Sequence, residues 1–162
     1  MTPAFAFANV TIRELSPVPV AMLSHVGHPA GIAASVERFI ALRKAAGLRP
    51  PESATYNVYR IGPSDAAPER FRMDLCAGTN GRREVLEGLT LGEIPGGRRA
   101  VLRVTGPEAL LEAAIPWLRR DWFVRSGETL GDFPAYCQRV AMPPQVRATA
   151  MVSDLFLPLR PR

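Results

Sequence analysis

The chain runs through one pattern twice, first as Val20-Ala21-Met22-Leu23-Ser24-His25-Val26-Gly27-His28-Pro29 and, 79 positions later, as Arg99-Ala100-Val101-Leu102-Arg103-Val104-Thr105-Gly106-Pro107-Glu108. After a slip of one residue the match continues, with Tyr56 corresponding to Tyr136 and Asp74-Leu75 to Asp154-Leu155. Two copies are too few for a stacked solenoid, which needs three or more. We therefore expect one domain over residues 1–162, with copies at about 10–78 and 84–159 that share a core. The seam between two packed copies is a common place for a ligand pocket.

The composition is that of an ordinary globular domain. Of the 162 residues, 47% are apolar and 22% charged. No apolar run approaches the roughly 18 residues that a membrane-spanning helix needs. The first residues lack the basic, apolar pattern of a secretory leader. We expect a cytoplasmic protein with no membrane partner.

The net charge of +5 does not by itself indicate nucleic-acid binding. Lys44 is the single lysine, and the arginines are scattered along the chain. Binding to nucleic acid requires basic residues gathered on one face or in a recognisable module. We therefore expect a small-molecule ligand and no direct DNA binding, while the sequence leaves a protein partner open.

The cysteines and histidines do not form a metal-binding pattern. Cys76 and Cys137 lack Cys-x-x-Cys spacing, and a disulfide is not expected in a cytoplasmic protein. His25 and His28 are the only closely spaced ligand types, and they lie beside a turn. We expect no metal and no cofactor.

Hydrophobic periodicity and turn residues predict an α+β domain with about eight strands in a largely antiparallel sheet. Pro116 falls inside the second predicted helix and should kink it, because proline cannot donate a backbone hydrogen bond. The helices are predicted from Gly27-His28-Pro29 to Gly47 and from Pro107 to Ser126-Gly127. The strands are predicted at 10–15, 18–26, 56–60, 71–76, 85–94, 98–105, 133–140 and 148–157.

Several stretches together resemble the GyrI-like effector-binding family, over about Val10 to Leu159. That family comprises the ligand-sensing halves of multidrug-responsive transcription regulators and small stand-alone gyrase-inhibitor-like proteins. The stretches are Tyr56-Asn57-Val58-Tyr59 followed by Pro63, Pro68-Glu69-Arg70-Phe71-Arg72-Met73-Asp74-Leu75-Cys76, Ile94-Pro95-Gly96-Gly97, and Trp117-Leu118-Arg119-Arg120-Asp121-Trp122 leading to Ser126-Gly127.

The resemblance implies a duplicated strand-helix-strand-strand unit. Its curved antiparallel sheet would carry two helices and a pocket at the pseudo-two-fold axis. In the regulators a helix-turn-helix region precedes this domain, but only about nine residues precede the first predicted strand here. The resemblance therefore implies a stand-alone effector domain.

The chain departs from the family where a strand typically carries a pocket glutamate followed two residues later by a tyrosine. Cys137 stands at the glutamate position and Arg139 at the tyrosine position. Residues two apart on a strand share a face, so both would point into the implied pocket. A buried carboxylate favours cations, and its replacement beside a guanidinium should favour a neutral or anionic aromatic ligand. The alternative is that Cys137 is a small core residue and Arg139 extends to solvent.

The repeat extends this predicted site to the first copy. Asn57 corresponds to Cys137 and Tyr59 to Arg139, so these four residues are the expected ligand contacts. Tyr56 and Tyr136, which also correspond to each other, should then face the opposite way, under the helices.

The two tryptophans are expected to play different roles. Trp117 and Trp122 lie about 140° apart on a regular helix, so they should not share a face. We expect Trp117 in the core. The resemblance makes Trp122 the candidate for the pocket wall.

Two classes of function fit the sequence. The favoured one is non-catalytic binding of a small aromatic molecule, for sensing or sequestration. The alternative is a hydrolase of electrophilic aromatic natural products, but the glutamate and tyrosine that such chemistry uses in the superfamily are absent at residues 137 and 139. Binding to gyrase, as by gyrase-inhibitor-like proteins, remains a third candidate.

Overall fold

The structure is a computed structural model that describes residues 5–61, 67–84 and 86–162. Pro63, named above in a stretch that carries the family resemblance, and the predicted strand residue Val85 lie outside the described residues. The chain divides into two compact units. We call Pro17–Pro95 the middle unit, and Met1–Ser16 together with Gly96–Arg162 the split unit. The expected single domain over residues 1–162 stays a prediction.

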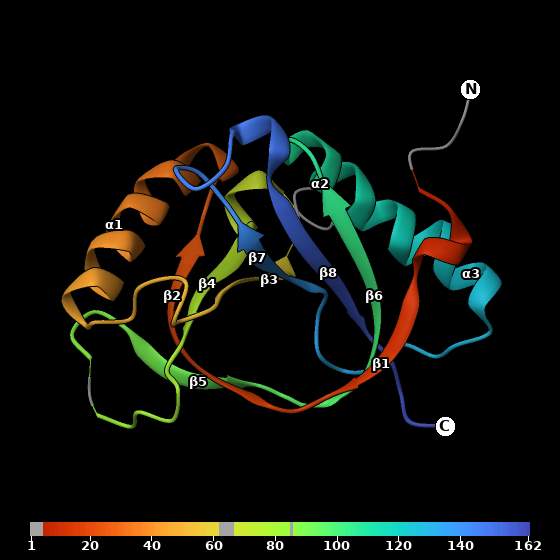
Figure 1. The fold of residues 1–162 in the computed structure, drawn as a ribbon, viewed down its shortest axis with the longest axis horizontal. Helices are drawn as coiled ribbons and strands as arrows, with labels where there is room; N and C mark the ends of the chain where they lie inside the picture. Colours follow the sequence, from red (N-terminus) through yellow and green to blue (C-terminus); the bar gives the residue numbers. More distant parts are fainter. Residues whose placement is uncertain (1–4, 62–66, 85) are drawn as a thin grey trace. The chain divides into compact units, whose positions relative to one another are not determined.

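The middle unit is a four-stranded antiparallel sheet with one long helix. The strand order is β3-β4-β2-β5, and helix α1 packs on β2 and β4 (Figure 1). Its elements are β2 (Val18–Val26), α1 (Ile32–Ala45), β3 (Thr55–Ile61), β4 (Arg72–Gly78) and β5 (Thr90–Ile94), with short 3-10 turns at Pro29–Gly31 and Pro68–Arg70.

The split unit has the same design. Its strand order is β7-β8-β6-β1, and helix α2 packs on β6 and β8 (Figure 1). Its elements are β1 (Thr11–Leu15), β6 (Gly97–Thr105), α2 (Glu108–Pro116), a π-helical turn (Trp117–Trp122), α3 (Phe123–Ser126), β7 (Tyr136–Ala141) and β8 (Val152–Pro158), with 3-10 turns at Phe7–Asn9 and Ala148–Ala150. The predicted α+β class, the antiparallel pairing and the duplication are confirmed.

Each copy of the repeat lends its first strand to the unit that contains the rest of the other copy. Strand β1 pairs with β6 rather than with β2, which follows it in the chain, and β5 pairs with β2 rather than with β6. The connecting residues explain why no hairpin forms. A two-residue hairpin turn needs a positive φ at its first central residue, and neither Ser16-Pro17 nor Pro95-Gly96 has one. As a result, β1 and β5 do not pair with the strands that follow them in the chain, and each pairs with a strand of the other copy.

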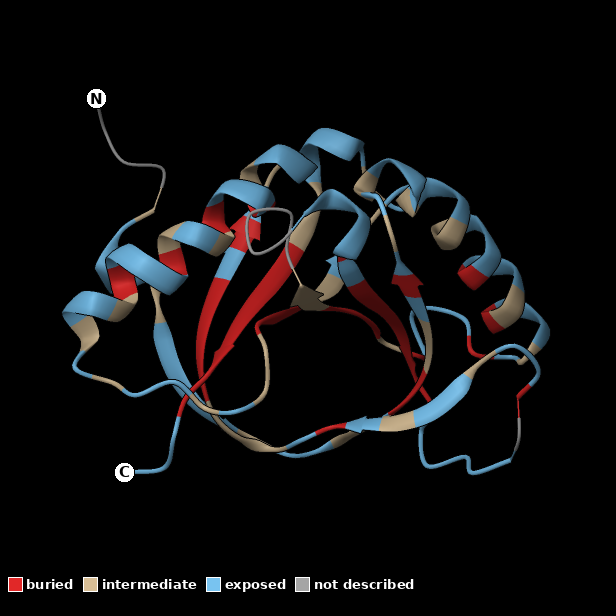
Figure 2. Cartoon of the chain, turned by 180° about the vertical axis from the view of Figure 1, so that it is seen from behind, coloured by how far each residue is buried: buried red, intermediate tan, exposed pale blue. Residues whose placement is uncertain are grey.

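The core of the middle unit lies between α1 and the sheet. Phe39 of α1 packs with Met73, Leu75 and Ala77 of β4, and these side chains are almost completely buried. In Figure 2 the strands carry most of the buried residues, while the outer surfaces of the helices are exposed. Burial of these apolar side chains is the main stabilising contribution to the unit.

A buried arginine closes the loop after α1. Arg43 donates hydrogen bonds from Nε to the carbonyl of Leu48 (2.7 Å), from Nη2 to that of Ser53 (3.0 Å) and from Nη1 to Thr55 Oγ1 (2.6 Å). Burial lowers the pKa of its guanidinium. Gly47, with φ of +74°, ends the helix as the sequence predicts.

Three predicted strands are shorter than expected, and the one predicted over 133–140 begins only at Tyr136. The strand predicted over 85–94 is a strand only from Thr90, because Gly88 has φ of +76° and the amide of Leu89 bonds to the carbonyl of Leu86 in a turn. The strand predicted from Ala148 begins with a 3-10 turn and becomes extended at Val152. Apolar alternation alone did not distinguish these turns from strand.

Candidate functional site

The predicted site residues Asn57 and Tyr59 share the face of β3 that α1 covers. In the antiparallel register Asn57 lies opposite Leu75 and Tyr59 opposite Met73, both members of the core under α1. Tyr59 packs against that core. Asn57 is buried, and its Nδ2 donates to the carbonyl of Tyr56 (3.1 Å).

Cys137 and Arg139 share the corresponding face of β7, on the side of α2. Both Arg139 Nη atoms bind the carboxylate of Glu108 in the first turn of α2, at 2.7 and 2.8 Å. The Arg139 side chain is 12% exposed, so it does not extend into solvent as the alternative interpretation required. Cys137 is fully buried.

A register shift follows each of these pairs. The pairing of β3 with β4 shifts between Tyr59 and Ile61, and that of β7 with β8 shifts between Arg139 and Ala141. Such bulges bend a strand and re-aim its side chains, and they are frequent beside binding sites. In both copies, therefore, the predicted residues directly precede a register shift at the corresponding position of the strand.

Tyr56 and Tyr136 do lie on the opposite face, but that face is not the one under the helices. Tyr136 lies opposite Phe156, and their rings stack with centroids 4.8 Å apart. Its hydroxyl accepts a hydrogen bond from Nε of the buried Arg99 (3.1 Å). The expectation that these tyrosines lie under the helices is wrong, because the helices cover the face of Tyr59 and Arg139 instead.

The fifth predicted residue, Trp122, lies in the π-helical turn and is 3% exposed. Trp117, expected in the core, is the more exposed of the two tryptophans. The expectation that they cannot share a face is wrong, because it assumed 3.6 residues per turn. In this turn the amide of Phe123 bonds to the carbonyl of Leu118, so residues five apart are stacked along the helix.

The change of helix type follows Pro116. Proline has no amide hydrogen and its ring crowds the preceding turn, so a regular ladder of hydrogen bonds cannot continue through it. The amide of Trp117 bonds instead to the carbonyl of Ala114, three residues back. The sequence predicts the disturbance at Pro116 but not its form.

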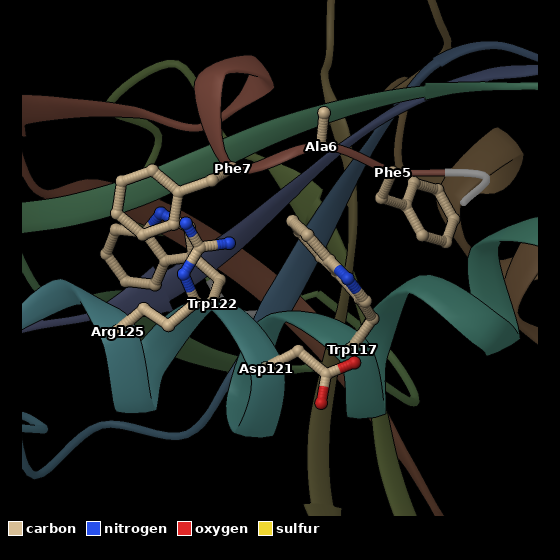
Figure 3. Close-up of a pocket in the computed structure, with 7 residues that line it drawn as sticks. All are labelled: Phe5, Ala6, Phe7, Trp117, Asp121, Trp122 and Arg125. Carbon is tan, nitrogen blue, oxygen red and sulfur yellow. The ribbon is translucent and has the colours of Figure 1, made fainter. Parts of the chain in front are cut away.

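Both tryptophans line one cavity of about 360 Å³ in the split unit (Figure 3). The N-terminal segment forms its other wall. The ring of Phe5 lies 5.4 Å from that of Trp117, and the ring of Phe7 stacks on Trp122 at 5.9 Å, both between centroids. Ala6, Asp121 and Arg125 complete the lining.

The two cysteines are buried and form no disulfide within the part of the chain that the structure describes. Burial raises the pKa of Cys76 to about 12, with the carboxylate of Asp74 adding to the rise. No group of three His, Cys, Asp or Glu side chains among the described residues could hold a metal ion. No helix among them is long and apolar enough to cross a membrane.

His25 holds the corner between β2 and α1. Its Nε2 lies 3.1 Å from the carbonyl of His28, so Nε2 carries the hydrogen, and Nδ1 accepts from Ser35 Oγ at 2.7 Å. The ring also packs against Phe71. These contacts give His25 a structural role at this corner.

Sequence reasoning missed two contributors. Glu108, the partner of Arg139, corresponds in the repeat to Pro29, so the duplication provides no signal for it. Phe5 and Phe7 precede the first predicted strand, and their alternation with alanine predicts no contact with a helix.

The model of the family described as GyrI-like small molecule binding domain matches residues 8–160. The probable transcriptional regulator YgiV of Escherichia coli strain K12 is 32% identical over 153 residues, which cover 93% of this chain and 96% of YgiV.

Two solved structures share the fold at low sequence identity. The C-terminal domain of EcmrR superposes with a TM-score of 0.75 at 11% identity, covering 93% of this chain and 96% of that domain. The structure of SAV2435 bound to tetraphenylphosphonium superposes with a TM-score of 0.64 at 8% identity, covering 93% of each chain. At such identities the likeness shows the fold alone.

Proposed function

Since the chain belongs to the GyrI-like family of small-molecule-binding domains, we propose that it binds a small aromatic molecule, neutral or anionic, without chemical turnover. The proposed contacts are Asn57, Tyr59, Trp122, Cys137 and Arg139. Binding would serve to sense or sequester the ligand.

One observation supports the proposed charge of the ligand. The side of β7 that faces α2 presents a buried thiol and an arginine whose charge Glu108 neutralises. Cys137 is fully buried, and Arg139 makes two hydrogen bonds to Glu108. A cation at this face would find no unpaired carboxylate from these residues, and it would meet the guanidinium of Arg139. A neutral aromatic ligand has no charge for this arrangement to repel. An anionic ligand can accept a hydrogen bond from Arg139 alongside Glu108.

SAV2435 provides the contrast, since that protein is seen with the cation tetraphenylphosphonium. If charge at position 137 decides the preference, this chain should bind that cation weakly. The burial of Cys137 supports this, because a charge effect is strongest where water is excluded.

The test is a thermal-shift and calorimetric series on one ring system: naphthalene-2-carboxylate, naphthalene-2-carboxamide and 2-naphthylmethylamine, with tetraphenylphosphonium alongside. We expect the carboxylate and the amide to bind and the two cations to bind at least tenfold more weakly, a difference of about 1.4 kcal/mol. Clear preference for the cations would overturn the proposal.

Substitutions at two positions assign the preference to this face. Cys137→Glu should raise the affinity for 2-naphthylmethylamine, while Cys137→Gln, of the same size without charge, should not. Arg139→Gln should weaken binding of the carboxylate and leave the amide almost unchanged. If the buried glutamate of Cys137→Glu prevents folding, Arg139→Gln still tests the proposal. Equal effects of Arg139→Gln on the carboxylate and the amide would contradict it.

A further inference from the structure

The cavity beside the π-helical turn has the features of a second binding site. Its volume, about 360 Å³, is within the range of small-molecule pockets. Four aromatic rings line it, from Phe5, Phe7, Trp117 and Trp122. In Figure 3, Trp117 has Phe5 on one side and Phe7, Trp122 and Arg125 on the other. It shares only Trp122 with the contacts proposed above.

Two opposite charges line the same cavity without binding each other. Asp121 is exposed and makes no hydrogen bond or ion pair within the described chain. The guanidinium of Arg125 lies over the ring of Phe7, with its central carbon 4.7 Å from the ring centroid. This cation–π contact draws Arg125 towards the N-terminal segment and leaves the carboxylate of Asp121 available.

We propose that this cavity binds a small aromatic molecule that carries both an ammonium and a carboxylate group, the chemistry of an aromatic amino acid. The ring stacks on the indoles, the ammonium group donates to Asp121, and the carboxylate accepts from Arg125. Each part of the ligand then meets a group of opposite character. The proposal shares Trp122 with the contacts proposed for the other ligand, whereas Asp121 and Arg125 belong to this cavity alone.

The chain has only two tryptophans and both line the cavity, so their indole N–H signals report on it directly. The experiment is a titration of the ¹⁵N-labelled protein followed by two-dimensional NMR, with Trp117→Phe assigning the two signals. The ligands are unlabelled tryptophan, tryptamine and indole-3-propionate, which share the indole ring. Tryptophan carries both an ammonium and a carboxylate group, tryptamine only the ammonium group, and indole-3-propionate only the carboxylate group.

We expect tryptophan to shift both indole signals and to bind about fivefold more tightly than either single-charge ligand, as one exposed charge contact is worth about 1 kcal/mol. Asp121→Asn should weaken tryptophan and tryptamine but not indole-3-propionate. Arg125→Met should weaken tryptophan and indole-3-propionate but not tryptamine. Glu112→Gln and Arg120→Met, on the same helical segment outside the lining, are the matched controls.

Three results would overturn the proposal. One is that the indole signals do not move at millimolar tryptophan. A second is that the single-charge ligands bind as tightly as tryptophan. The third is that the control variants weaken binding as much as Asp121→Asn and Arg125→Met do. Because Asp121 and Arg125 are not among the contacts proposed for the naphthalene ligands, the variants at these two positions let the two proposals fail separately.

Discussion

Asp154 is held by two hydrogen bonds from Arg103, whose Nε and Nη2 lie 2.8 and 3.0 Å from its carboxylate oxygens. In the other copy Asp74 occupies the same position, and Ser24 stands where Arg103 does. Asp74 accepts a hydrogen bond from Ser24 Oγ at 2.6 Å, and its charge partners are Arg60 of the next strand at 2.8 Å and Arg72 of its own strand at 3.5 Å. The duplication keeps the carboxylate and changes the source of its counter-charge.

Removal of the two carboxylates should cost different amounts of stability. The Asp74 side chain is completely buried, whereas Asp154 is 12% exposed and its partner Arg103 is 61% exposed. Breaking a buried pair costs about 3 kcal/mol, and breaking a pair at the surface about 1 kcal/mol or less. Urea unfolding of Asp74→Ala and Asp154→Ala should reproduce this order. Equal losses would show that burial does not decide the difference.

Tyr136→Phe should destabilise the split unit through Arg99. The guanidinium of this arginine is buried, and it would lose one acceptor while the ring stack of Tyr136 on Phe156 stays. A hydrogen bond to a charged group is worth about 2 kcal/mol. A double-mutant cycle with Arg99→Met should give a coupling energy of that order, and additive losses would refute the link.

The thiol of Cys76 should make the protein less stable at alkaline pH. Burial raises its pKa to about 12, whereas a thiol in the unfolded chain titrates near about 8.5. Between these values the unfolded chain has released the proton and the folded chain has kept it. This contribution to stability is therefore complete below about pH 8.5 and is lost as the pH rises towards 12.

The measurement is the free energy of unfolding in urea at pH 7, 9 and 10. In this window the native chain should lose up to about 1.4 kcal/mol per pH unit more than Cys76→Ala does. At pH 8 the thiol should also resist a disulfide reagent until the protein unfolds. Parallel pH profiles for the two proteins would disprove the assignment.

Pro116→Ala should restore the missing backbone donor and convert the π-helical turn towards a regular helix. Trp117 and Trp122 would then turn apart, because five residues of regular helix leave them about 140° from each other. We expect the near-ultraviolet circular dichroism of the tryptophans to change and the contact of Phe7 with Trp122 to weaken. An unchanged spectrum would mean that packing, not Pro116, imposes the turn.

Much of the fold could be predicted from the sequence because its signals are local. The repeat defines the element order, Gly47 and Gly127 end helices through their left-handed backbone, and turn residues on either side of an apolar run mark strands such as Val18–Val26. The partner of an edge strand is not local information. Alternation in Thr11–Leu15 defines two faces but does not say which strand it binds, so the exchange of β1 and β5 became visible only in the structure.

The correspondence of positions in the two copies was predictable for the same reason, and the candidate site itself stays a prediction. In the repeat Asn57 corresponds to Cys137 and Tyr59 to Arg139. The register shifts in the two copies occur at corresponding positions. The counter-charge on Arg139 comes from Glu108, in another element, and the π-helical turn depends on how a helix accommodates Pro116. Both are outcomes of packing, which a one-dimensional pattern does not contain.

The exchange of first strands has an evolutionary consequence. A polypeptide with only one copy would have no strand of its own to pair with the outer edge of β2, and that edge would stay open. Two such polypeptides could complete one another by trading β1, as domain-swapped homodimers do. The present chain is then equivalent to that dimer joined end to end by gene duplication. Once joined, its halves were free to diverge, and they now differ at the position of Ser24 and Arg103.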